Sequence, residues 1–135
     1  MNPKHFKLLG YLQIFIGMGA VAGGLPLLLD PSGTSQGLTL ETLANTPFQN
    51  FLIPGILLFL VNGVGSLISS YFSFKFKPEA GILGIIFGIA LMVWIGFQLY
   101  IMGYASWLQP FYFAMGTFEV ILGFLIYSKK LIIDN

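Results

Sequence analysis

The sequence predicts an all-α integral membrane protein, an antiparallel bundle of four spanning helices with both termini in the cytoplasm. Hydrophobic residues make up 56% of the 135-residue chain and charged residues only 8%. Soluble domains carry roughly 25% charged residues, so most of this protein's surface must face something apolar. The apolar residues also gather in four long runs. We therefore expect a single membrane domain over residues 1–135.

Each of the four runs is long enough to cross a bilayer, since a spanning helix needs about 20 mostly apolar residues. The expected spans are residues 6–29, 52–74, 80–102 and 110–128. Pro54 and Pro110 stand near the starts of the second and fourth spans, where a missing N–H costs nothing. Pro26 lies in the last turn or so of the first span and is expected to kink or end it.

The first span has a competing interpretation as a secretory signal peptide. Lys4 and Lys7 precede an apolar run that reaches a cleavage-like Ala20-Val21-Ala22. The apolar run continues beyond this point to Leu29, which favours a retained membrane span.

The connections between the spans are unequal in length. Residues 30–50 form a long external loop rich in Ser, Thr, Gly and Pro, whereas the other two connections are short. Within the long loop, Leu38, Leu40 and Leu43 alternate with polar residues. We expect one or two turns of helix there, lying on the membrane surface.

The positions of the lysines predict the orientation, because cytoplasmic loops of membrane proteins are enriched in Lys and Arg. All six lysines fall on one side of a four-span topology, and the other side carries Asp30 and Glu41. The lysines are Lys4, Lys7, Lys75, Lys77, Lys129 and Lys130. The expected location is the cell membrane, with the N- and C-termini inside.

Composition excludes several classes of chemistry. The chain has no cysteine, no arginine and a single histidine, His5, outside the apolar runs. Disulfides, thiolate nucleophiles and Cys-based metal sites are therefore absent, and no Ser-His-acid set can form. The net charge of +1 is too small to suggest a nucleic-acid partner. We expect no catalytic residues, no metal and no cofactor. An enzymatic activity is therefore not the favoured interpretation.

Small and polar residues recur at helical spacing along the spans, as they do on the buried faces of membrane bundles. Most of these positions are interpreted as sites of close helix packing. The glycines assigned to packing are Gly17, Gly24, Gly84, Gly88, Gly116 and Gly123.

Glu119 is the one acid expected inside the membrane. It stands nine residues from each end of its span, or about 14 Å from both interfaces. Asn62 lies about 15 Å deep in the second span and is its expected partner, whereas Gln13 and Gln98 are placed at other depths. No lysine is within reach, so the neutral acid is the expected form. Glu119 and Asn62 then form either a packing hydrogen bond, worth about 0.6–2 kcal/mol, or a proton- or ligand-binding site.

A second candidate site lies near the outer ends of the helices. Trp94 and Gln98 are one turn apart, Gln109 directly precedes the fourth span, and Tyr112 lies in its first turn. Together these side chains could hold an aromatic or quinone-like headgroup in an outer pocket. The alternative is that Trp94 only anchors the helix at the interface.

A resemblance rests on the architecture as a whole. The chain combines a short cytoplasmic N-terminus, the segment Leu25-Pro26-Leu27-Leu28-Leu29-Asp30-Pro31, a polar outer loop and the stretch 47–63. In these features it resembles small four-span bacterial membrane proteins of largely unknown function, and in size, span count and long first external loop the DoxX-like family. That family has been linked to quinone-coupled sulfur redox chemistry and to membrane redox complexes. No site residue of the family can be matched to a position in this sequence.

Three functions are consistent with these residues. The favoured one is a non-enzymatic accessory or interaction subunit of a larger membrane complex, because so small a chain offers few polar groups for chemistry. The others are a small proton-coupled transporter built around Glu119, as a homo-oligomer, and a lipid- or quinone-binding protein using the outer pocket. In each case the lipid bilayer is the surrounding partner.

Overall fold

The computed structural model describes residues 2–134, with side chains described for residues 2–129. The single domain expected over 1–135 thus includes Met1 and Asn135, which lie outside the described residues. The described chain is helical apart from its loops and turns. Its elements are α1 (Pro3–Leu29), η1 (Thr34–Gln36), η2 (Leu40–Leu43), α2 (Leu52–Ile56), η3 (Leu57–Val64), α3 (Gly65–Phe74), α4 (Glu79–Met102) and α5 (Leu108–Asp134).

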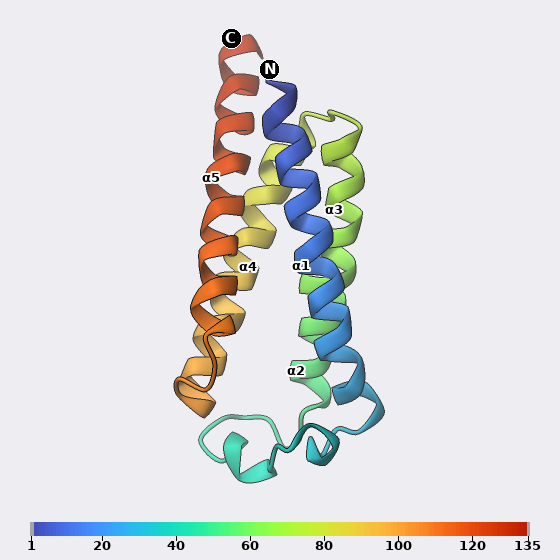
Figure 1. Ribbon diagram of the computed structural model, residues 1–135, viewed down its shortest axis with the longest axis vertical. Coiled ribbons are helices and arrows are strands. Elements are labelled where there is room, and N and C mark those ends of the chain that lie inside the picture. Colours follow the sequence, from blue (N-terminus) through green and yellow to red (C-terminus); the bar gives the residue numbers. More distant parts are fainter. Residues whose placement is uncertain (1, 135) are drawn as a thin grey trace.

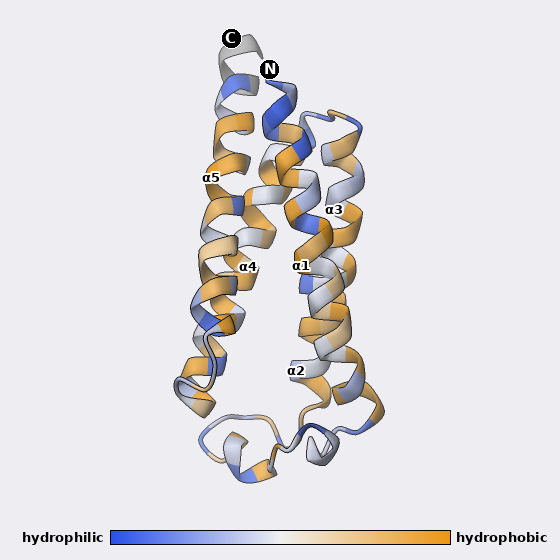
Figure 2. Cartoon of the chain, viewed as in Figure 1, coloured by the Kyte–Doolittle hydropathy of each residue, from blue (hydrophilic) through white to orange (hydrophobic). Residues whose placement is uncertain are grey.

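Four long helices cross the molecule, because α2, η3 and α3 follow one another without a break (Figure 1). The prediction of four helices long and apolar enough to span a membrane is confirmed. These segments are Pro3–Leu29, Leu52–Phe74, Glu79–Met102 and Leu108–Lys129. Hydrophobic residues predominate along all four (Figure 2). Large apolar side chains also cover the outside of the bundle, where Val93, Met18 and Phe124 are 65%, 62% and 58% exposed.

The helix ends follow from local capping. Helix α1 begins three residues earlier than expected, because Asn2 accepts a hydrogen bond from the backbone N–H of Lys4 and Pro3 occupies the first turn. Helix α5 begins two residues before Pro110, which fits in the first turn without a missing bond. Pro26 does not end α1, which continues to Leu29.

The four helices form a closed ring of antiparallel neighbours. Helix α1 packs against the α2–η3–α3 helix on one side and against α5 on the other, and α4 contacts α5 and α3. Both termini and the α3–α4 turn lie at one end of the bundle, which we call the terminal end (Figure 1). The loop between α1 and α2 lies at the opposite end, the loop end.

The long loop folds as a cap on the loop end. The backbone N–H of Phe51 donates to the carbonyl of Pro31 at 2.8 Å, which closes the loop at its base. The expected helical turn is η2, and its Leu43 is buried with Leu27 and Phe51. At the start of the loop, hydrogen bonds from Ser32 and the backbone of Ser35 hold the pKa of Asp30 below its ordinary value.

Candidate functional site

The six packing glycines lie at helix–helix contacts. A Cβ at Gly17 or Gly24 would lie within 3.0 Å of atoms of the α2–η3–α3 helix. The other four bring α4 and α5 together, and a Cβ at Gly123 would lie 2.6 Å from the carbonyl oxygen of Gly81. The close approach pairs Gly84 with Gly123 and Gly88 with Gly116. These contacts fix the helices that carry the polar side chains described next.

Glu119 of α5 lies in the interior of the bundle and is fully buried. Its Oε2 accepts a hydrogen bond from Nε2 of Gln13 at 3.2 Å, and Oε1 of Gln13 accepts one from Ser73 at 2.8 Å. The Gln13 amide therefore connects three helices: it belongs to α1, its nitrogen donates to α5, and its oxygen accepts from α3. Gln13 and Ser73 are also fully buried.

The expected pairing of Glu119 with Asn62 is wrong, because Gln13 holds the carboxyl instead. The predicted depth of each residue was counted from the end of its own helix, on the assumption that all helix ends lie at the same height in the bundle. They are not level: Gln13 lies well inside α1, yet it bonds to Ser73, one residue before α3 ends. The ends of α1 and α5 extend past the α3–α4 turn (Figure 1). Depth counted from the ends therefore placed Gln13 too close to the surface.

Three buried oxygen atoms among the described side chains make no hydrogen bond: Oδ1 of Asn62, Oγ of Ser66 and Oε1 of Glu119. By contrast, Ser69 and Ser73, on the same face of α3, donate to the carbonyls of Gly65 and Ser69. Leaving a buried polar group unpaired costs about 1–3 kcal/mol. Such positions are where a ligand, a water molecule or an ion is most readily accommodated.

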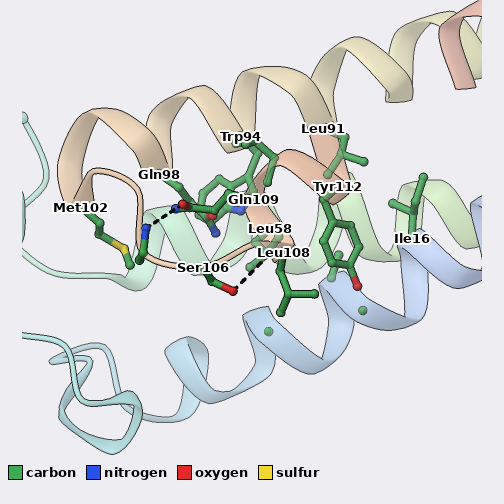
Figure 3. Close-up of a pocket in the computed structure, with 15 residues that line it drawn as sticks. Ile16, Leu58, Leu91, Trp94, Gln98, Met102, Ser106, Leu108, Gln109 and Tyr112 are labelled. Atoms are coloured by element: carbon green, nitrogen blue, oxygen red, sulfur yellow. Dashed lines mark hydrogen bonds between the residues drawn. The ribbon is translucent and has the colours of Figure 1, made fainter. Parts of the chain in front are cut away.

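A cavity of about 340 Å³ opens between α1, α4 and α5 near the loop end of the bundle. Trp94, Gln98 and Tyr112, the residues expected to form an outer pocket, all line it, and so does Gln109 (Figure 3). We call it the outer cavity. Its remaining wall is almost entirely apolar or small, formed by Ile16, Gly19, Ala20, Gly23, Leu58, Leu91, Ile95, Met102, Ala105, Ser106 and Leu108.

Of the polar side chains considered in the outer cavity, Gln109 is hydrogen-bonded within the protein and the other three are not. Gln109 is part of the turn before α5, since it accepts from the backbone N–H of Ala105 and donates to the carbonyl of Gly103. Trp94, Gln98 and Tyr112 make no hydrogen bond to any described residue. All three can donate one: an indole N–H, a carboxamide and a phenol. The cavity thus presents three available donors on an apolar wall.

The outer cavity and the Glu119 network occupy successive levels of the bundle. The inner end of the cavity is formed by Ile16, Leu91 and Ile95, which pack together as a buried cluster. Gln13 lies one turn from Ile16 toward the terminal end, and Glu119 lies two turns from Tyr112, or about 10 Å, in the same direction. An apolar layer therefore separates the cavity from the buried carboxyl.

A second cavity of about 280 Å³ lies on another side of the bundle, between the α2–η3 segment and α4. We call it the Asn62 groove, because Asn62 is the one strongly polar side chain that lines it. Its other lining residues are Phe48, Pro54, Leu57, Val61, Ala90, Val93, Trp94 and Phe97. Trp94 lines both cavities, so its side chain forms a wall between them.

Comparison with known proteins adds no relative: no family model, curated protein or solved structure matches the chain. Among the described residues, no cluster of three or more His, Asp or Glu side chains could hold a metal ion. Sequence reasoning did not identify Gln13 as a site residue. Its place in the same stripe as Gly10 and Gly17, spaced as a buried helix face, was the available signal.

Proposed function

We propose that the four long helices span the cell membrane with the terminal end in the cytoplasm. The support for this proposal is the length and apolar character of the helices, their apolar outer surface, and the distribution of the lysines. Five lysines with described side chains, Lys4, Lys7, Lys75, Lys77 and Lys129, belong to the terminal end, and the loop end has none. Positive charge of this kind marks the cytoplasmic side.

Within that membrane domain, we propose that the protein binds a small amphipathic molecule of the quinone or lipid class in the outer cavity. The observation that carries this proposal is the set of three unpaired donors on an apolar wall. Donors of this kind suit a headgroup with carbonyl oxygens, and the rings of Trp94 and Tyr112 suit a flat one. The cavity is large enough for a small headgroup, since ligand pockets measure about 300–1,000 Å³.

This proposal is compatible with the prediction of a non-enzymatic accessory subunit. A small membrane protein that holds a quinone or lipid can supply it to, or stabilise it within, a larger complex. No chemistry by the protein itself is needed, because binding alone is the activity. Co-purification of a stoichiometric partner would support the accessory role, and native mass spectrometry from mild detergent would report subunit count and bound small molecules together.

The test uses tryptophan fluorescence, since the chain has only two tryptophans. With Trp107 replaced by Phe, Trp94 is the single reporter inside the cavity. We expect decylubiquinone to quench it saturably in detergent. Gln98→Leu removes one donor and should weaken binding about tenfold, equivalent to about 1.4 kcal/mol.

Tyr100→Leu provides a matched control, because Tyr100 lies on the same helix, is 69% exposed and does not line the cavity. It should bind the quinone like the parent. Linear, unsaturable quenching of equal strength in the parent and Gln98→Leu would mean that the quinone only partitions into the detergent, and the proposal would be wrong.

A second candidate function, a proton-coupled carrier, has one specific observation in its favour. Glu119 Oε1 is buried and unpaired, while Oε2 is connected through Gln13 to Ser73 near the terminal end. A carboxyl placed in this way could exchange a proton through polar side chains. If Glu119→Gln folds and keeps full transport activity for any substrate found, proton coupling through Glu119 is excluded.

A further inference from the structure

The Asn62 side chain is buried without a hydrogen bond, although it faces a cavity. Asn62 is only 3% exposed, and its Oδ1 has no partner. No hydrogen bond joins its Nδ2 to any described residue either. A carboxamide can accept at its oxygen and donate from its nitrogen. The amide thus holds an unused pair of hydrogen-bonding groups beside the Asn62 groove, although its Oδ1 has almost no surface open to the groove.

The groove opens on the outer surface of the bundle. Val93, Leu57 and Val61, which line it, are 65%, 44% and 37% exposed. Phe48 of the loop cap lines it at the loop end and packs edge-on against Phe97 of α4. No charged side chain lines the groove, so a charged ligand group would find no partner there. Its occupant is therefore a mainly apolar molecule that enters from the surrounding lipid.

The helix around Asn62 is itself unusual. Residues Leu57–Val64 form a π-helix, a rare conformation that is often found at functional sites. On the side facing α1, Gly63 permits close contact, since a Cβ there would lie 2.9 Å from Val21. The wider turn thus brings η3 against α1 through Gly63, while the neighbouring Asn62 lines the groove toward α4.

The depth of Asn62 in the membrane limits which chemical groups of a bound molecule can reach it. Asn62 is ten residues from the start of the Leu52–Phe74 helix, or about 15 Å along its axis. The charged headgroup of a phospholipid stays at the membrane surface, because burying charge in the hydrocarbon is costly. A polar group that reaches Asn62 must therefore be uncharged and carried partway along an apolar chain.

We propose that the Asn62 groove binds a membrane lipid whose acyl chain carries a hydroxyl group near its middle. When the Asn62 side chain turns toward the groove, the hydroxyl donates to Oδ1 and accepts from Nδ2, while the chain lies along the apolar walls. Both hydrogen-bonding partners, costly to bury separately, satisfy one another in the groove. This site shares only Trp94 with the outer cavity; it rests on the proposed membrane insertion and not on the proposed quinone binding.

The experiment compares two phosphatidylcholines, one with a mid-chain hydroxyl on its stearoyl group and one with plain stearoyl. The purified protein is incubated with equal amounts of both, and retained lipid is measured by native mass spectrometry. We expect about a fivefold preference for the hydroxylated lipid, equivalent to about 1 kcal/mol. Asn62→Leu should abolish the preference, whereas Tyr100→Leu, at an exposed position of α4 that lines neither cavity, should leave it intact.

A second variant keeps the test decisive if Asn62→Leu does not fold. Val93→Trp fills the groove from an exposed position on α4, so folding does not depend on it, and it should also remove the preference. Equal retention of the two lipids by the parent protein would show ordinary surface lipid only and would overturn the proposal. A preference that survives both Asn62→Leu and Val93→Trp would likewise overturn it.

Discussion

Gln13 connects the two ends of the buried polar network through a single side chain. It donates to Glu119 and accepts from Ser73, and all three side chains are fully buried. Buried polar groups are costly when one partner is removed and nearly neutral when both are replaced by apolar groups. We therefore expect the losses of unfolding free energy from substitutions at these residues to be non-additive.

Replacing Glu119 tests this coupling. Glu119→Leu leaves the Gln13 Nε2 without an acceptor and should destabilise the protein by about 1–3 kcal/mol. Glu119→Gln keeps an acceptor oxygen and should cost clearly less. Thermal unfolding in detergent, followed by intrinsic fluorescence, measures both. Adding Gln13→Leu to Glu119→Leu should cost less than the two single changes summed, and equal losses in Glu119→Leu and Glu119→Gln would contradict the network.

The sequence predicts which residues are buried and polar better than it predicts which of them meet. Glu119 and Asn62 are both buried polar residues, as their positions inside the spans indicate. Their pairing depended on relative helix offset, which is set by packing contacts between distant segments and leaves no local signal. The lining residues Trp94, Gln98 and Tyr112 of the outer cavity could be identified because all three lie near one end of the spans.

Helices α4 and α5 meet backbone to backbone along their glycines. Gly81, Gly84 and Gly88 of α4 meet Gly116 and Gly123 of α5. Without a hydrophobic driving force between helices in lipid, such close packing is a main source of association. The stability of this pair should therefore depend on the absence of side chains at the contact.

Two alanine substitutions separate packing from helix propensity. Gly123→Ala places a Cβ 2.6 Å from the Gly81 carbonyl and should destabilise the protein by about 1–3 kcal/mol, as overpacking does. Gly96→Ala on α4 meets nothing within 4 Å and should be neutral or stabilise by up to about 1 kcal/mol. The thermal midpoint should fall in Gly123→Ala and should stay unchanged or rise in Gly96→Ala. A loss in both variants would mean that glycine flexibility, rather than close contact, is what these helices require.

At the scale of elements, the sequence predicts where the helices lie but not the internal conformation of each one. Apolar runs located the helix ends to within three residues, because hydropathy is a property of composition; the exception is the end of α5, which continues six residues past the expected end, to Asp134. The π-helical segment Leu57–Val64 could not be predicted, since its residues are equally suited to an α-helix. This segment packs against α1, and sequence periodicity does not encode contacts with a distant segment.

For the molecule as a whole, orientation is the property most directly open to experiment. The chain lacks cysteine, so single-cysteine variants carry no background. Gln36→Cys in the loop cap should react with a membrane-impermeant maleimide on intact cells, and Asn2→Cys only after the membrane is opened. Both positions are exposed on the protein. The reverse pattern would contradict the proposed orientation, and labelling of both on intact cells would mean that the protein inserts in two directions.

Because Trp94 forms a wall of both cavities, binding in one cavity can affect binding in the other. Any molecule that shifts the indole while occupying one cavity changes the shape of the other. Linkage then requires the effect to be mutual: if a quinone alters the affinity for a lipid, the lipid alters the affinity for the quinone by the same factor. One aromatic ring would thus let the lipid composition of the membrane regulate what the outer cavity holds.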